Sequence, residues 1–127
     1  MIPGNGTKEL DRVSTPRRVL VLEDGVLLAM HLETVLAENG HMPVPAASLA
    51  AAEQCLAQGP VDVALLDLML PDGTSLDLAQ ALREAGTAVA ILSGADDDQI
   101  PAGFEFARHF RKPVHPEKLM TWINSLT

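Results

Sequence analysis

Acidic side chains follow two apolar runs of this sequence at the point where each run ends. Glu23 and Asp24 close the run that begins at Arg18, and Asp67 directly follows Val63–Leu66. Apolar runs of this length are typical of buried parallel strands, whose carboxyl ends meet at one edge of a sheet. If the two strands are neighbours, the three carboxylates converge and, left unpaired, repel one another. A hard divalent cation such as Mg²⁺ relieves that repulsion, because it prefers carboxylate oxygens and often shares a phosphoryl ligand.

A hydroxyl and an ammonium group are expected at the same edge of the sheet. The fourth apolar run, Ala88–Leu92, ends at Ser93, and the fifth candidate strand, Arg108–Arg111, is followed by Lys112. Carboxylates, a hydroxyl and a lysine together suit phosphoryl chemistry, in which a carboxylate is the nucleophile and cations neutralise the phosphoryl oxygens. The set therefore predicts an aspartyl phosphate on Asp67.

A regular alternation of predicted strands and helices positions these residues. The patterns predict strands over about 18–23, 41–47, 63–66, 88–92 and 108–111, and helices over about 25–39, 48–58, 75–85 and 117–126. Such an alternation with short connections predicts an α/β fold, a parallel sheet with helices on both faces. Pro43 and Pro45 lack ladder donors, so the second strand is an edge strand. The segment 95–106 contains Pro101 and Gly103 and predicts at most one or two helical turns.

The first predicted helix has apolar residues on two faces. Its core face is a stripe at helical spacing, made of Leu28, Leu32, Val35 and Leu36. Val26, Leu27 and Met30 are also apolar, yet they lie away from that stripe and soon after Asp24. We interpret these three residues as a candidate partner-docking patch. Isolated apolar residues are also common on surfaces without any function, so this alternative stays open.

Composition narrows the class of protein. The chain has 127 residues, enough for one core, and its net charge of −8 argues against a nucleic-acid-binding surface. Cys55 is the single cysteine, so no internal disulfide is possible. No apolar stretch reaches membrane-spanning length, and the polar segment 1–16 lacks the apolar core of a secretory signal. We expect a cytoplasmic protein with a flexible tail over 1–16 and one domain over 17–127.

Four segments carry a resemblance to a known family. They are Val-Leu-Val-Leu-Glu-Asp (19–24), Leu-Leu-Asp-Leu-Met-Leu-Pro-Asp-Gly (65–73), Ile-Leu-Ser-Gly (91–94) and Lys-Pro (112–113). In this order, each at a strand end, they resemble the receiver domain of response regulators in two-component signalling, and the likeness runs from Arg17 to the end of the chain. The resemblance implies a flavodoxin-like three-layer sandwich whose five parallel strands have the order 2-1-3-4-5.

The resemblance also implies roles for the matched residues. Asp67 would accept the phosphoryl group. Mg²⁺ would be bound by Asp67, by Asp24 directly, by Glu23 through water and by the backbone carbonyl of Met69. Ser93 and Lys112 would contact the phosphoryl oxygens, and Pro113 would follow a cis peptide bond.

The sequence departs from the family pattern in two places that bear on signalling. His109 stands where the family usually has Tyr or Phe, three residues before the lysine, which puts the usual aromatic switch in doubt. The spacing between Ser93 and Lys112 is a few residues shorter than usual, so the fourth helix should be short, displaced or mobile. This pattern is similar to a subset of stand-alone receivers whose fourth helix is reduced to a loop.

The implied function is that of a phospho-acceptor and not of an enzyme with a separate substrate. A sensor histidine kinase or a histidine phosphotransfer protein would donate the phosphoryl group, and the first helix would be the docking surface. Because nothing follows Thr127, we expect a stand-alone regulator, monomeric or weakly dimeric, that acts on a protein target or in a phosphorelay. The alternative is a pseudo-receiver, an interaction module that is never phosphorylated. A dehalogenase-like phosphatase is disfavoured, because it needs a second acid where Met69 stands.

Overall fold

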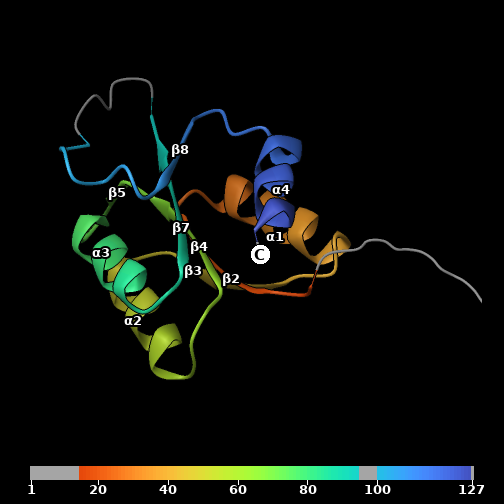
Figure 1. Cartoon of the computed structure of the whole chain (residues 1–127), viewed down its shortest axis with the longest axis horizontal. Helices are drawn as coiled ribbons and strands as arrows, with labels where there is room; N and C mark the ends of the chain where they lie inside the picture. The colour runs from red at the N-terminus through yellow and green to blue at the C-terminus, as the bar shows by residue number, and fades with distance from the viewer. Residues whose placement is uncertain (1–14, 95–99, 127) are drawn as a thin grey trace, which may run out of the picture.

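Five parallel strands form the central sheet of the protein. The computed structural model describes residues 15–94 and 100–126. The strands are β2 (Arg18–Leu22), β3 (Met42–Ala46), β4 (Val63–Asp67), β7 (Ala88–Ser93) and β8 (Arg108–Arg111). Their order across the sheet is β3-β2-β4-β7-β8, which is the predicted 2-1-3-4-5 (Figure 1). The predicted fold class is confirmed.

Within the described residues, two helices cover each face of this sheet. They are α1 (Val26–Glu38) and α4 (Pro116–Ser125) on one face, and α2 (Leu49–Ala57) and α3 (Leu76–Glu84) on the other (Figure 1). The strands are buried on both faces, as a doubly covered parallel sheet requires. In β2, for example, Val19 and Val21 pack under α1 and α4, whereas Leu20 and Leu22 face the layer that contains α2 and α3. All four residues have no exposed surface.

The predicted core stripe of α1 is confirmed. Leu32 and Leu36 are 1% exposed, and Leu28 and Val35 pack against the same core cluster. The second strand, β3, lies at the edge of the sheet, where the missing N–H groups of its prolines are tolerated. Among the described residues, no helix is long and apolar enough to cross a membrane.

The segment between β7 and β8 differs most from a regular β-α-β unit. Residues 100–107 form turns and contain no helix, in agreement with a reduced fourth helix. Phe104 is buried there, and its ring centroid lies 5.6 Å from that of Phe106. We predict from sequence that 95–103 exchanges its amide hydrogens rapidly, but residues 95–99 lie outside the described residues. The same holds for residues 1–14 of the predicted tail.

A small antiparallel ribbon follows β4, where Pro71, Asp72 and Gly73 by themselves predict only a turn. It pairs β5 (Met69–Leu70) with β6 (Gly73–Thr74), and Asp72 lies in the two-residue connection. The Asp72 carboxylate accepts hydrogen bonds from the backbone N–H groups of Leu49 (3.0 Å) and Ala50 (3.1 Å). These two hydrogen bonds, which we call the Asp72 clamp, connect the loop after Asp67 to the first turn of α2.

Capping of the two helices on this face differs. A serine at the start of the predicted helix 48–58 is a candidate cap, and Ser48 does cap α2, because its hydroxyl accepts a hydrogen bond from the N–H of Ala51 at 3.1 Å. Ser75 occupies the N-cap position of α3, but its side chain makes no capping hydrogen bond. By residue type and position, the sequence offers Thr74 and Ser75 as candidate caps for the predicted helix 75–85. The Ser75 hydroxyl is buried instead, so this expected capping role is not found.

We expect that Asp72→Ala lowers the thermal unfolding midpoint, because two N–H groups of the α2 N-terminus lose their acceptor. The two backbone hydrogen bonds lower the pKa of Asp72. The stabilising effect of Asp72 is therefore fully present at a pH above the pKa that its carboxyl group has in the unfolded chain. The effect is lost as the pH falls through the lower pKa of the same group in the folded protein. Circular dichroism melts should show the difference from wild type shrinking in acid. Glu53→Gln, an exposed change on the same helix, is the control, and equal midpoints for Asp72→Ala and wild type would contradict the clamp.

Candidate phosphoryl-acceptor site

The three predicted carboxylates meet at the carboxyl edge of the sheet. Glu23 and Asp24 follow β2, and Asp67 ends the neighbouring strand β4. One carboxylate oxygen of each lies within 4.8 Å of the other two. Glu23 and Asp67 are buried, 4% and 2% exposed, whereas Asp24 is exposed to solvent. The cluster thus has a buried floor and one acid open to solvent.

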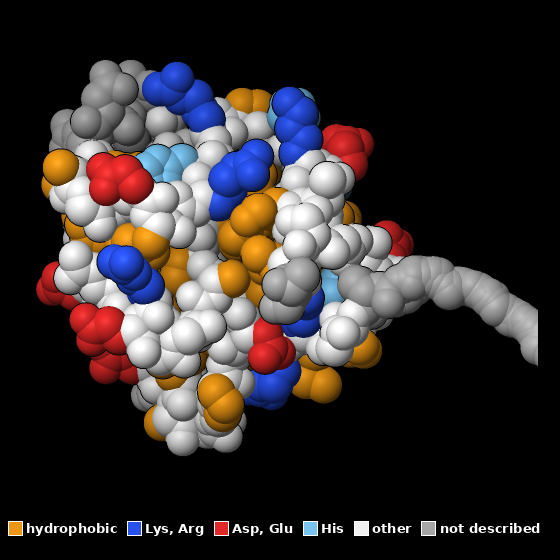
Figure 2. Space-filling model, viewed as in Figure 1, with side chains coloured by type: hydrophobic (Ala, Val, Ile, Leu, Met, Phe, Trp, Pro, Cys, Tyr) orange, Lys and Arg blue, Asp and Glu red, His pale blue; other side chains and the backbone are white. Residues whose placement is uncertain are grey.

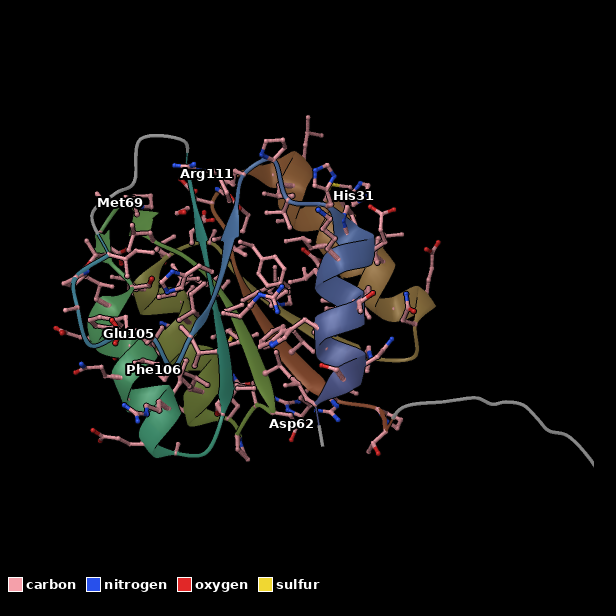
Figure 3. The ribbon with its side chains drawn as sticks, turned by 45° about the horizontal axis from the view of Figure 1, so that its top comes forward. His31, Asp62, Met69, Glu105, Phe106 and Arg111 are labelled. Carbon is pink, nitrogen blue, oxygen red and sulfur yellow. The ribbon has the colours of Figure 1, made fainter. Side chains whose placement is uncertain are left out.

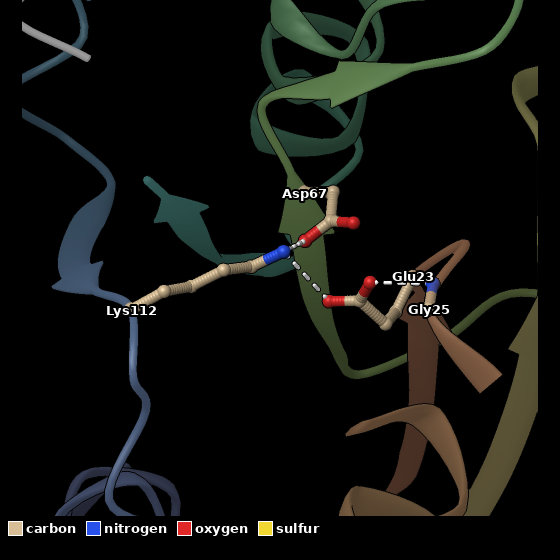
Figure 4. A network of polar contacts seen from close by, with 4 residues as sticks. All are labelled: Glu23, Gly25, Asp67 and Lys112. Carbon is tan, nitrogen blue, oxygen red and sulfur yellow. Dashed lines mark hydrogen bonds and ion pairs between the residues drawn. The ribbon is translucent and has the colours of Figure 1, made fainter. Parts of the chain in front are cut away.

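Lys112 reaches into this cluster from the end of β8 and bridges two of its acids. Its Nζ lies 2.8 Å from Oδ1 of Asp67 and 3.0 Å from Oε1 of Glu23 (Figure 4). Burial and the neighbouring Glu23 raise the pKa of Asp67 from 3.8 to about 7, although Lys112 opposes this shift. Burial alone would lower the pKa of Lys112, but its contacts with Asp67 and Glu23 raise it overall. The ammonium therefore stays charged beside the strand-end aspartate.

One oxygen of Asp67 is left over in this network. Oδ2 is buried and has no hydrogen-bond partner among the residues that the structure describes. A buried carboxylate oxygen without a partner is costly, and such a group usually serves an ion, a water or chemistry. Together with the nearby oxygens of Glu23 and Asp24, it forms an oxygen-only donor set of the kind that Mg²⁺ prefers. The residues present therefore fit a magnesium ion.

Pairing of neighbouring strands places the hydroxyl and the lysine at this edge. Asp67 is opposite Leu92 in the β4–β7 pair, so Ser93 follows one residue further along the same edge. The backbone N–H of Lys112 donates to the carbonyl of Ser93 at 2.7 Å, and the Lys112–Pro113 peptide bond is cis. Ser93 is 8% exposed. The two residues from the ends of β7 and β8 are thus held side by side.

Gly25 supports the site and was missed by reasoning from the sequence. Its N–H donates to Oε2 of Glu23 at 2.8 Å, which leaves Oε1 for Lys112. A Cβ atom at this position would lie 3.0 Å from Oε2, so a side chain there would require the Glu23 carboxylate to shift by a few tenths of an ångström. The signal in the sequence was a glycine directly after the acidic pair and before the helix.

The remaining predicted residues lie around the rim. Met69 is in β5, two residues after Asp67, and its side chain is 59% exposed (Figure 3). His109, at the position of the usual aromatic, is exposed, and its Nε2 lies 3.2 Å from the carbonyl oxygen of Phe104. It therefore connects β8 to the segment that takes the place of the fourth helix.

The candidate docking residues are on the surface of α1. Val26, Leu27 and Met30 are 69%, 84% and 58% exposed, in contrast to the buried stripe of the same helix. Val26 and Met30 also line a groove of about 320 Å³ that contains Glu23 and Asp24. The apolar patch is thus continuous with the acidic cluster.

The fold and the acid–lysine cluster define the class of protein, and comparison with known families agrees. Residues 19–124 match the model of the response regulator receiver domain. The chain belongs to this family.

Its relatives are bacterial regulators and receiver domains of known structure. The chain is 30% identical over 115 residues to the TorCAD operon transcriptional regulatory protein TorR of Escherichia coli O157:H7, a match that covers 87% of the chain and 50% of TorR. It thus spans about half the length of that relative. The solution structure of SdrG from Sphingomonas melonis Fr1 superimposes with a TM-score of 0.74 at 27% identity, covering 87% of the chain and 96% of SdrG. A CheY-like receiver domain from Methylobacillus flagellatus, 23% identical, shows the same fold with a TM-score of 0.76, covering 87% and 98% of the two chains.

Proposed function

We propose that this protein is a phospho-acceptor that takes a phosphoryl group onto Asp67. The observation that carries the proposal is the state of the Asp67 carboxylate, which has one oxygen on Lys112 and a second, buried oxygen without a partner among the described residues. An acid held in this way is ready to receive a group at the second oxygen. Membership of the receiver family supports the same role.

The reaction follows from where the charges lie. The donor is a phosphohistidine of a sensor kinase or of a histidine phosphotransfer protein. An oxygen of Asp67 attacks phosphorus, a P–O bond forms, the P–N bond breaks, and the imidazole leaves with the bond's electron pair and takes up a proton. The Lys112 ammonium can pair with the negatively charged phosphoryl oxygens, because it already lies beside Asp67. Ser93, at the end of β7, supplies a hydroxyl to the same oxygens.

Residues of this chain would also hold Mg²⁺ beside the acceptor. We assign Asp24, Asp67 and the backbone carbonyl of Met69 as direct ligands and Glu23 as a ligand through water. The ion, when bound, supplies positive charge against the acids and the phosphoryl oxygens. Glu23 is held back from direct contact with an ion by the N–H of Gly25 and by Lys112, which supports the assignment through water.

Labelling with acetyl phosphate tests the proposal directly. With Mg²⁺ present, intact-mass spectrometry should show the gain of one acid-labile phosphoryl group, and chelation of the metal should prevent it. The competing pseudo-receiver function predicts no gain under either condition. The buried, lysine-paired acceptor favours phosphorylation over that alternative, because nothing in a pure interaction module requires these acids to be packed together.

The donor would dock on α1. The patch of Val26, Leu27 and Met30 is exposed, and it adjoins the acids through a shared groove. Transient contacts between proteins commonly use such small apolar patches with a polar surround. A cytoplasmic kinase domain or phosphotransfer protein would thus meet the receiver domain, which we assign to residues 17–127.

We expect that Leu27→Glu with Met30→Glu slows phosphotransfer from the cognate kinase by about tenfold or more, since two apolar contacts are lost and two charges would be desolvated. Folding and acetyl-phosphate labelling should be preserved, because neither side chain belongs to the core. Gln54→Glu with Gln80→Glu, two exposed changes on α2 and α3 that alter net charge equally, is the matched control. Equal transfer rates in the two double variants would place the docking site elsewhere.

A further inference from the structure

The groove beside α1 is lined by apolar and acidic residues only. Its volume of about 320 Å³ is within the range of small-ligand pockets, and it lies between α1 and the end of β3. Of its ten lining residues, seven are apolar and three are acidic: Glu23, Asp24 and Glu33. Basic side chains are not scarce on the protein as a whole, because Figure 2 shows Lys and Arg spread over the face that it presents. The lining of the groove therefore favours a cation over an anion.

Two of these acids are available to a ligand. Glu23 is already occupied, because its oxygens contact Lys112 and the N–H of Gly25. Asp24 is exposed just before α1, and Glu33 is half-buried on that helix. Neither Asp24 nor Glu33 has an ion-pair partner among the residues that the structure describes. A positively charged ligand would therefore find two unpaired carboxylates in one groove.

The spacing of the lining residues separates these two acids along the helix. Val26, Met30 and Glu33 lie at helical spacing on one stripe of α1, and Asp24 precedes that stripe. At a rise of about 1.5 Å per residue, the stripe from residue 26 to residue 33 is about 10 Å long. The groove thus has one unpaired acid near each end.

Apolar side chains line the space between the two acids. Ala29 and Met30 form the wall on α1, and Pro45, Ala46 and Ala47 form the opposite wall. Methylene groups pack favourably on such walls, and carboxylates form charge-assisted hydrogen bonds with ammonium groups. A ligand that matches the groove therefore has a positive charge at each end and an alkyl chain between the charges.

We propose that this groove binds a linear aliphatic diamine or polyamine, with one ammonium group at Asp24 and another at Glu33. A single metal ion cannot join these two acids, because carboxylate ligands of one ion lie within about 2–3 Å of it. A lysine or arginine side chain of a protein partner carries its charge at one end only, so it matches half of the groove. The inference does not depend on the proposed phosphorylation.

Calorimetric titration of metal-free protein with hexamethylenediamine, without any phosphodonor, tests the inference. Wild type should bind the diamine at one saturable site, and binding should weaken as salt is added. Hexylamine has the same alkyl chain with one charge and should bind about fivefold more weakly, because one ion pair is missing. Ethylenediamine has both charges on a chain too short to reach both acids, and it should also bind more weakly.

Two pairs of variants place the diamine in the groove. Glu33→Gln should weaken binding about fivefold, because one of the two ion pairs is lost. Glu38→Gln is the matched control, since it removes the same charge from an exposed position on α1 outside the groove. Ala47→Phe should weaken binding by filling the groove, whereas Ala57→Phe, an exposed change on α2, should bind like wild type. Circular dichroism checks that each variant is folded, and if Ala47→Phe is not, the two glutamine variants decide alone.

Three outcomes would overturn the inference. Equal diamine affinity in Glu33→Gln and Glu38→Gln would mean that net charge, and not the groove, attracts the amine. Equal affinity of wild type for hexylamine and hexamethylenediamine would mean that only one acid takes part. Tighter binding of the blocked peptide Ala-Lys-Ala than of the diamine would make a protein side chain the occupant.

Discussion

An Asp67→Asn variant will gain no phosphoryl group from acetyl phosphate under conditions that label wild type fully. The amide cannot act as the oxygen nucleophile, and it removes one of the three carboxylates that would hold Mg²⁺. We expect the rate to fall by more than about a hundredfold, below detection by intact mass, as is usual when the nucleophile itself is removed. Lys112 and Glu23 remain, so any residual labelling would have to come from another acid.

Asp77→Asn is the matched control for this variant. Asp77 is an exposed acid in the first turn of α3, outside the acid cluster, and its replacement should leave labelling unchanged. Mapping of the label by peptide mass spectrometry after borohydride reduction would identify the acceptor in wild type. Equal labelling of Asp67→Asn and wild type would remove Asp67 from its proposed role.

The same substitution will stabilise the protein when no metal is present. The folded state holds Asp67 with a pKa of about 7, against 3.8 for the isolated group. Between these values the folded state keeps a proton that the unfolded chain has released, so the free energy of unfolding falls as the pH rises. This fall in the free energy of unfolding is complete once the pH exceeds the pKa of Asp67 in the folded state. The neutral amide of the variant would carry no such penalty, and we expect Asp67→Asn to gain about 1–2 kcal/mol over wild type at pH above about 7, after allowance for solvent screening.

Urea unfolding with a chelator present, at a mildly acidic and a mildly alkaline pH, measures this effect. The advantage of Asp67→Asn over wild type should be small at the acidic pH and larger at the alkaline pH. Mg²⁺ should reduce that advantage, because the ion binds and stabilises folded wild type more than the variant. Asp77→Asn should follow wild type throughout. If the stability advantage of Asp67→Asn over wild type did not change with pH, then burial and Glu23 would not raise the pKa of Asp67 in the folded protein.

Local patterns were sufficient to predict most of the fold. The apolar run Val63–Leu66 is too uniform for a strand with one exposed face, so a sheet covered on both sides followed from it. The prolines of β3 placed that strand at an edge. Helix α1 was predicted with its buried and exposed faces, because the period of its leucines records which side meets the sheet.

Contacts between distant segments could not be predicted in this way. The β5–β6 ribbon, the Asp72 clamp on α2 and the buried hydroxyl of Ser75 each depend on where the loop after Asp67 lies relative to α2 and α3. Turn-forming residues predict that the chain reverses direction. They do not predict which distant residues the side chains of the turn will contact. The expected cap on α3 was wrong for this reason.

The sequence by itself determined that acids, a hydroxyl and a lysine stand at strand ends, because strand direction and the side at which strands end follow from local pattern. Only the tertiary structure decided how they share their charges: Lys112 bridges Asp67 and Glu23, and Gly25 holds the other oxygen of Glu23. These arrangements depend on burial and on ångström-scale distances between strands far apart in the chain, and both arise only when the sheet is assembled.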